Sequence, residues 1–259
     1  MYRAIKSDLK RGILSYRFLF ALFCMFLVWE LNRRRFEIHP GEDLLYLYIH
    51  TRGRTLMSLL SLVVTAIPCT SFLCEDYENR MINYSIVRSG VNSYIIAKMI
   101  TVFISAFLIM FLGSFLFLLW GNLSLPLIVE NSLAVTNFGK MGCSGYLLPE
   151  YAWLYIWIQV VMDGLQCASM AVLAMAGSVF LNHSHAVLIF PFVFNYFFYY
   201  LFSRNGMPTW LSIEFIYNTS AGTYSESLVF IIGYAILITI LFVVFSFSIL
   251  KWRLGVRYK

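Results

Sequence analysis

"MITVFISAFLIMFLGSFLFLLW", residues 99–120, contains no Asp, Glu, Lys or Arg, and the run without these residue types continues to residue 129. About 20 consecutive apolar residues in a helix are enough to cross the hydrocarbon core of a bilayer. The whole chain has this character, because 60% of its 259 residues are hydrophobic and only 12% are charged. This composition argues against a soluble protein and predicts an all-α, polytopic membrane protein.

Further apolar runs on both sides of this stretch predict six spans in total. Residues 55–74 and 227–250 also lack Asp, Glu, Lys and Arg, and residues 164–203 are long enough for two spans separated by a polar hairpin. The first run, Phe18 to Trp29, is short, but the charged residues at its ends can extend toward the membrane surface. The predicted spans are approximately residues 14–31, 55–75, 96–120, 152–181, 186–202 and 227–250.

Basic residues predict the orientation of these spans. Lys and Arg are frequent near both termini and in the loop after the second span, and the positive-inside rule places such segments in the cytoplasm. An even number of spans brings both termini to one side, which agrees with this assignment. The Arg-rich loop at residues 32–54 argues against it. We expect both termini in the cytoplasm.

The first residues of the chain have the pattern of an amphipathic helix. Tyr2, Ile5, Leu9 and Ile13 fall on one face of a helix, and basic residues lie on the other side. Such a helix lies in the membrane surface before the chain turns into the bilayer. The alternative is a frayed basic tail.

"CEDYENRMINYSIVRSG", residues 74–90, joins the second and third predicted spans and is unusually polar for this chain. Acidic residues come first and Arg88 lies near the end, as the helix dipole favours, while Gly90 suits the position after a helix. The pattern predicts a short helix at about residues 76–89, outside the membrane. A connection that only reverses the chain needs about 2–8 residues. We therefore expect a partner to bind this connector.

The connections on the opposite side of the predicted membrane are longer and uneven. Residues 121–151 are rich in Gly and contain two Pro residues. Residues 203–226 contain several aromatic residues, which suit the membrane interface. We expect part of 203–226 to re-enter the membrane as a short helix.

One short motif raises the possibility of an enzyme. "GCSG", Gly142–Gly145, matches the nucleophile motif of rhomboid proteases, which also have six spans. Those enzymes need a histidine base on a late span, and residues 227–250 contain no histidine. The better interpretation is a turn in a loop, so we expect no catalytic residue in this chain.

No cofactor or metal site is predicted either. The phosphate-binding pattern G-x-x-x-x-G-K-[ST] is absent, because the only Gly-Lys pair, Gly139-Lys140, is followed by Met141. His183 and His185 are too few ligands for a metal without a nearby carboxylate or thiolate. The five cysteines have the spacing of neither a zinc site nor a disulfide set.

Asp163 is the only Asp or Glu well inside a predicted span. Gln159 lies four residues before it and Gln166 three residues after it, so the three share one helix face. Ionisable residues within membranes usually face a bundle interior or a water-filled cavity. Gln159, Asp163 and Gln166 could line a translocation path, or they could form a hydrogen-bonded seam between helices.

The chain resembles the membrane subunit of type-2 ABC transporters. The resemblance covers the amphipathic N-terminal helix, the six spans and the cytoplasmic connector, and its specific part is "FLCEDYENRMINYSIVRSGVNSYIIAKM". Members typically have an aromatic residue and a Glu closing the second span, a short helix, and a Lys opening the third. The corresponding positions here are Phe72, Glu75, Arg88, Gly90, Tyr94 and Lys98.

This resemblance implies a permease in the bacterial plasma membrane whose connector is a coupling helix that docks on a separate ATPase. The docking residues would be Glu75, Asp76, Glu78, Arg80, Tyr84, Ser85, Arg88 and Ser89. Two ATPase subunits would bind ATP and magnesium, and a second permease, identical or homologous, would complete the path. The implied cargo is an amphipathic or hydrophobic substrate, such as a lantibiotic peptide, a drug or a lipid, and no nucleic acid is involved. The alternative is a non-transport membrane protein, either an intramembrane enzyme or a regulatory subunit.

Overall fold

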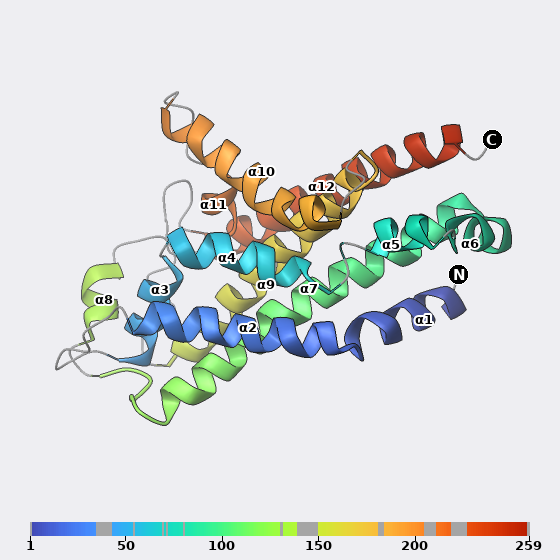
Figure 1. The fold of residues 1–259 in the computed structure, drawn as a ribbon. Helices are drawn as coiled ribbons and strands as arrows, with labels where there is room; N and C mark the ends of the chain where they lie inside the picture. The colour runs from blue at the N-terminus through green and yellow to red at the C-terminus, as the bar shows by residue number, and fades with distance from the viewer. Residues whose placement is uncertain are drawn as a thin grey trace.

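The structure is a computed structural model that describes residues 2–34, 43–53, 55–68, 70, 72–79, 81–129, 132–138, 150–180, 184–204, 211–218 and 227–257. Regular structure in these ranges is entirely helical, which confirms the all-α part of the predicted fold class (Figure 1). The helices are α1 (Tyr2–Ile13), α2 (Tyr16–Arg33), α3 (Leu44–Arg52), α4 (Thr55–Ala66), α5 (Phe72–Glu78), α6 (Met81–Ser89), α7 (Val91–Asn122), α8 (Leu133–Phe138), α9 (Ala152–Gly177), α10 (Ser184–Arg204), α11 (Ile213–Ile216) and α12 (Leu228–Arg257).

Three of the described helices are long and apolar enough to cross a membrane, namely α7, α9 and α12. A fourth crossing results if α1 and α2, which are bent by 52° between Ile13 and Tyr16, form one broken span. The other two predicted spans are shorter as apolar helices: α4 ends at Ala66, and the apolar part of α10 is Ala186–Leu201. Twelve residues of α4 rise only about 18 Å, less than the bilayer core. Six spans therefore stay a prediction, whereas a membrane-embedded helical protein is established.

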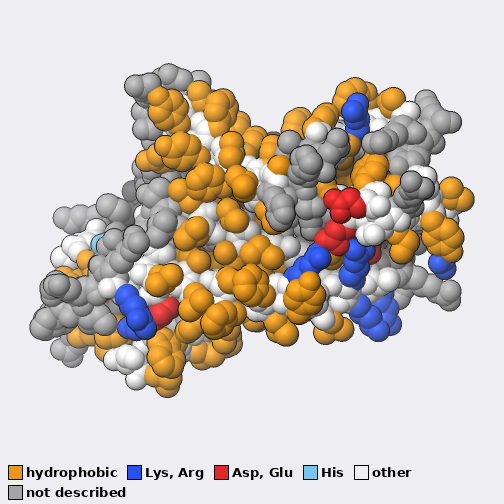
Figure 2. Space-filling model, viewed as in Figure 1, with side chains coloured by type: hydrophobic (Ala, Val, Ile, Leu, Met, Phe, Trp, Pro, Cys, Tyr) orange, Lys and Arg blue, Asp and Glu red, His pale blue; other side chains and the backbone are white. Residues whose placement is uncertain are grey.

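The long helices α7 and α9 form the centre of the bundle, and α2, α4 and α12 pack around them (Figure 1). Between α2 and α7 the backbones approach closely at Gly113, where an added Cβ would lie 2.5 Å from the Cγ of Met25. Small residues of this kind allow close contact between membrane helices. The apolar side chains left outside the bundle cover much of the visible surface, as expected for a protein that faces lipid (Figure 2).

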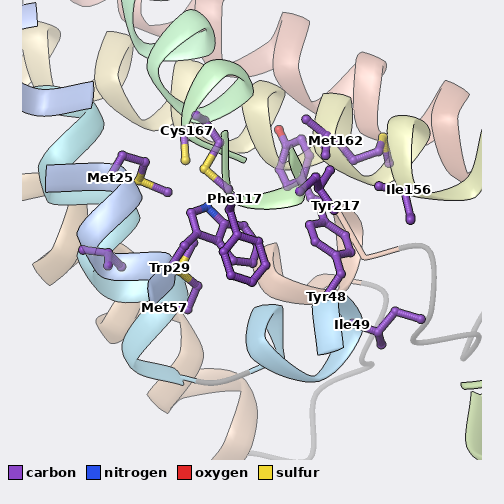
Figure 3. Packing of buried hydrophobic residues seen from close by; sticks show 14 of the residues in the cluster. Met25, Trp29, Tyr48, Ile49, Met57, Phe117, Ile156, Met162, Cys167 and Tyr217 are labelled. Carbon is purple, nitrogen blue, oxygen red and sulfur yellow. The ribbon is translucent and has the colours of Figure 1, made fainter. Parts of the chain in front are cut away.

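Helix α3 was not predicted, because its residues fall in the Arg-rich loop 32–54. Asp43 caps it by accepting a hydrogen bond from the backbone N–H of Tyr46 at 2.7 Å. Six of its nine residues are buried. Tyr48 stacks on Trp29 of α2, which in turn stacks on Phe117 of α7 (Figure 3). With nine residues, α3 is too short to register as a span, so the sequence pattern did not reveal it.

Replacing Gly113 with Leu should destabilise the bundle by about 1–3 kcal/mol, the usual cost of overpacking, because the new side chain collides with Met25. Gly233→Leu on α12 is the matched control, since a Cβ there meets nothing within 4 Å. The apparent melting temperature of the full chain in detergent measures both effects. Equal melting temperatures for the two variants would contradict the close packing of α2 on α7.

Candidate functional site

Charged and polar side chains gather at two places in the apolar bundle. The first, which we call the Asp163 cluster, consists of Tyr48, Arg52, Gln159, Asp163 and Tyr217. The second, the Asp76 cluster, consists of Asp8, Arg11, Asp76, Tyr94 and Lys98. Both include residues that were singled out in the sequence, and both include partners that were not.

Arg52, the last residue of α3, forms a bidentate ion pair with Asp163 in the middle of α9. Its Nε lies 2.8 Å from each carboxylate oxygen of Asp163, and its Nη2 lies 2.6 Å from Oδ1. Only 12% of the Arg52 side chain and 6% of the Asp163 side chain are exposed. Arg52 therefore supplies the counter-charge for Asp163. It belongs to the Arg-rich loop 32–54, whose basic residues argued against placing both termini in the cytoplasm.

The backbone carbonyl of Tyr217 joins this ion pair to the segment after α11. It accepts hydrogen bonds from Nη2 of Arg52 at 3.2 Å and from the side-chain amide of Gln159 at 3.1 Å, and the same amide lies 3.1 Å from Asp163. The Tyr217 hydroxyl lies 2.9 Å from that of Thr239 on α12. The cluster thus connects α3, α9, α12 and the Tyr217 segment.

Gln166 stands apart from the cluster although it shares the helix face of Asp163. It lines a cavity of about 40 Å³, together with Arg52, Asp163, Ser61, Cys167 and Asn218. A space of this size holds about one water molecule. In the described residues the stripe therefore forms a hydrogen-bonded seam around Gln159 and Asp163, with a small polar cavity beside Gln166. A translocation path along this stripe stays a prediction.

The Asp76 cluster fastens the amphipathic helix α1 to α5 and α7. Lys98 of α7 is 3% exposed and lies between two carboxylates, 2.9 Å from Asp76 and 3.1 Å from Asp8. The Tyr94 hydroxyl donates to Asp76 at 2.7 Å, and Arg11 of α1 contributes a further bond at 3.1 Å. Acidic and basic side chains are visible together at this end of the molecule, near α1 and α5 (Figure 2). A frayed N-terminal tail is thereby excluded for the described residues.

The pKa of Asp76 is lowered by this surrounding. Burial alone would raise the pKa, but the charge of Lys98 and the hydrogen bonds from Tyr94, Lys98 and Arg11 outweigh it. The carboxylate is thus the favoured form. Because the folded pKa lies below the unfolded value of about 3.9, the cluster stabilises the fold fully above that value. The stabilisation is lost as the pH falls through the folded pKa.

The predicted docking residues separate into two groups. Glu75 and Asp76 face inward, and Glu75 pairs with Arg11 at 2.8 Å and also with Arg17. Among the predicted docking residues, Glu78, Tyr84 and Arg88 are exposed, while Ser85 and Ser89 are half-buried. Arg80 lies outside the described residues.

Helix α6 has a clear division between a buried and an exposed side. Ile82 and Ile86 are buried, whereas five residues are exposed: Met81, Asn83, Tyr84, Val87 and Arg88. We call Met81, Tyr84, Val87 and Arg88 the α6 outer face. Val87 is 88% exposed and Tyr84 is 67% exposed. Met81 and Val87 were not predicted as contacts, although their spacing from Tyr84 and Arg88 was a usable signal.

Other sequence-based expectations fall largely outside the described ranges. The "GCSG" motif at Gly142–Gly145 and the His183 position belong to residues that the structure does not describe. Most of 203–226 does too, apart from α11 and its neighbours. Within the described ranges, no group of three or more His, Cys, Asp or Glu side chains could hold a metal ion.

Comparison with protein-family models, with curated proteins and with solved structures finds no match for this chain. The resemblance to ABC permeases rests on the residues of the connector and on the order of the helices.

Substituting Asp163 with Asn should lower the stability by about 3–5 kcal/mol, because Arg52 would remain buried without a counter-charge. Glu150→Gln, at the exposed start of α9, makes the same chemical change without a buried partner. Thermal unfolding of the full chain in detergent should separate the two variants. A double variant, Arg52→Met with Asp163→Leu, should recover much of the loss, and a loss larger than that of Asp163→Asn would argue against the ion pair as its cause.

Removal of the Asp76 carboxylate should loosen α1. Asp76→Asn removes a charged partner of Lys98 and Arg11, which should cost about 1–3 kcal/mol and speed hydrogen exchange in α1. Wild-type protein should show the same increase only when the pH falls below the lowered pKa of Asp76, because the folded carboxylate takes up a proton there. Glu78→Gln in the same helix is the control, since Glu78 is exposed. Unchanged exchange in α1 for Asp76→Asn would show that the cluster does not hold this helix.

Proposed function

We propose that this chain is the membrane permease subunit of an ATP-driven ABC exporter that acts with a separate ATPase. The observation that carries the proposal is the α6 outer face, an exposed surface on a short helix between two membrane segments. Apolar and aromatic residues such as Val87 and Tyr84 are usually found at protein contacts when they are exposed on a helix outside the membrane. Docking on an ATPase would explain why the α6 outer face is exposed.

The way α6 is mounted supports this role. Its neighbour α5 is tied to α1 and α7 through Glu75 and Asp76, so a force applied to α6 would reach α7 directly. Ile82 and Ile86 pack in the same apolar cluster as Tyr94 and Ile95 of α7. A rigid connection of this kind suits a helix that transmits movement from an ATPase to the membrane helices.

The division of the docking residues refines the proposal. Tyr84 and Arg88 would contact the ATPase, together with Met81 and Val87, and Glu78 would lie at the rim. Glu75 and Asp76 would act indirectly, by holding the connector in place. The Ser89 hydroxyl donates a hydrogen bond to the backbone carbonyl of Ser85 at 2.7 Å. Both serines would lie against small residues of the partner.

In the same proposal, the substrate would pass along Gln159, Asp163 and Gln166 between this chain and a second permease. The cavity of about 40 Å³ is too small for an amphipathic peptide, drug or lipid. Transport would therefore require α3 and the Tyr217 segment to move away from α9. Arg52 and Tyr217 are the contacts that would have to break.

The test is co-expression and co-purification with the candidate ABC ATPases of the source organism. The permease alone should hydrolyse no ATP, and the complex should hydrolyse it. A double variant, Tyr84→Ala with Val87→Ala, should weaken the complex at least tenfold, because two exposed anchors of the α6 outer face are removed. Leu14→Ala is the control. It truncates a residue that lies between α1 and α2 and is 79% exposed, and it should leave the affinity for the ATPase unchanged. ATP hydrolysis by the isolated chain, or equal affinity for the two variants, would overturn the proposal.

A further inference from the structure

A groove of about 490 Å³ lies between the first turn of α7 and the last turns of α12. Both belong to the end of the bundle where α1 and α6 also lie (Figure 1). The two helices are in contact just beside it, because Leu250 and Leu254 of α12 are fully buried in the same cluster as Ile95 of α7. The residues that line the groove include Asn92, Ser248, Lys251, Trp252, Gly255 and Val256.

Gly255 shows that the groove is open rather than filled by the protein. A Cβ added at this position would meet no atom within 4 Å. Glycine inside a helix costs about 0.5–1 kcal/mol relative to alanine, and at this position no clash within the described residues requires it. The groove is therefore open at this position, and a larger side chain there would project into it.

The groove carries a positive charge that is not balanced within the protein. Lys251 is exposed and has no carboxylate partner among the described residues, and its ammonium group lies 6.0 Å from the centre of the Phe247 ring. Three acidic residues at this end of the bundle form ion pairs, and none of these pairs involves Lys251. They are Asp8, Glu75 and Asp76, and their partners are Arg11, Arg17 and Lys98. An anion from another molecule could therefore bind next to Lys251 and balance its charge.

A second, apolar groove of about 440 Å³ lies farther along α7 and α12 toward the middle of the membrane, and Val172 of α9 also lines it. Val244 in this apolar groove is four residues before Ser248 in the first, so the two lie one helical turn apart. The other residues that line it are apolar apart from Thr239, and they include Met99, Phe103 and Ile240. Trp252, 61% exposed, lies at the charged end, where tryptophan typically marks the membrane interface.

We propose that these two grooves together bind one phospholipid with an anionic headgroup. The phosphate lies near Lys251 and the side-chain amide of Asn92, with the rest of the headgroup beside Gly255, and one acyl chain runs past Ser248 along Val244 and Phe103. The order of the contacts, basic and polar at the end of the bundle and apolar toward its middle, matches the order of groups along a phospholipid. The site is independent of the proposed transport function.

Native mass spectrometry of the full chain in detergent tests the headgroup. Phosphatidylglycerol should bind more tightly than phosphatidylcholine, and Lys251→Gln should reduce this preference by about fivefold, the effect of one basic side chain near a lipid surface. Lys10→Gln removes the same charge from an exposed position on α1 and should leave the preference unchanged. Equal preferences for the two variants would overturn the proposal.

Filling the groove tests the position of the lipid. Gly255→Leu places a side chain in open space and should reduce binding of phosphatidylglycerol several-fold without lowering the melting temperature. Gly233→Leu, at the other open glycine of α12, is the control and should bind as the wild type does. If Gly255→Leu instead changes the oligomeric mass in detergent, a second copy of the chain occupies the groove and the proposal is wrong. Unchanged lipid binding would contradict it as well.

Discussion

A carboxylate inside an apolar helix bundle needs a counter-charge, and this requirement determines the position of α3. Asp163 lies in the middle of α9 with 6% of its side chain exposed. Arg52 donates hydrogen bonds to its carboxylate through the Nε and Nη2 atoms of the guanidinium group. A buried ion that loses its partner costs several kcal/mol. Helix α3 is therefore held against α9 by a charge and against α2 by the stacking of Tyr48 on Trp29.

The same principle operates at the other end of the bundle, with a different geometry. Lys98 is even less exposed than Asp163, and it is neutralised by two carboxylates from separate helices. Because one of these, Asp8, belongs to α1, the surface helix is joined to the core by a charge as well as by its apolar face. Arg11 strengthens the connection, since its guanidinium also lies 4.6 Å from the centre of the Phe72 ring. The connector α5–α6 and the helix α1 thereby behave as one structural unit.

This arrangement relates the proposed function to the fold. The α6 outer face is exposed because α6 packs against α7 through Ile82 and Ile86 on its opposite side, whereas Glu75 and Asp76 of α5 form ion pairs inside the molecule. The Asp163 cluster closes the bundle toward α3 and Tyr217, whereas the groove next to Lys251 is open to lipid. One end of the molecule thus carries both the α6 outer face, which is proposed to dock a protein, and the groove that is proposed to bind a phospholipid. The other end is held closed by hydrogen bonds that a conformational change could break.

Composition and the distribution of charges were sufficient to predict a helical membrane protein, the amphipathic helix at Tyr2–Ile13 and helical structure in the connector. These features depend on local runs and periodicities, which do not need distant contacts. The single helix expected at 76–89 is instead divided into α5 (Phe72–Glu78) and α6 (Met81–Ser89). Gln159 and Asp163 were also identified from the sequence, because a charged residue among apolar neighbours is conspicuous. Their partners were not, since Arg52 and Tyr217 are separated from Asp163 by long stretches of chain and only packing brings them together. Likewise, Glu75 and Asp76 looked like docking residues until the tertiary structure showed them facing Arg11 and Lys98. The sequence determined which side chains are charged, and the fold decided which of those charges meet each other and which remain for a partner, because pairing depends on distances that only the packed helices define.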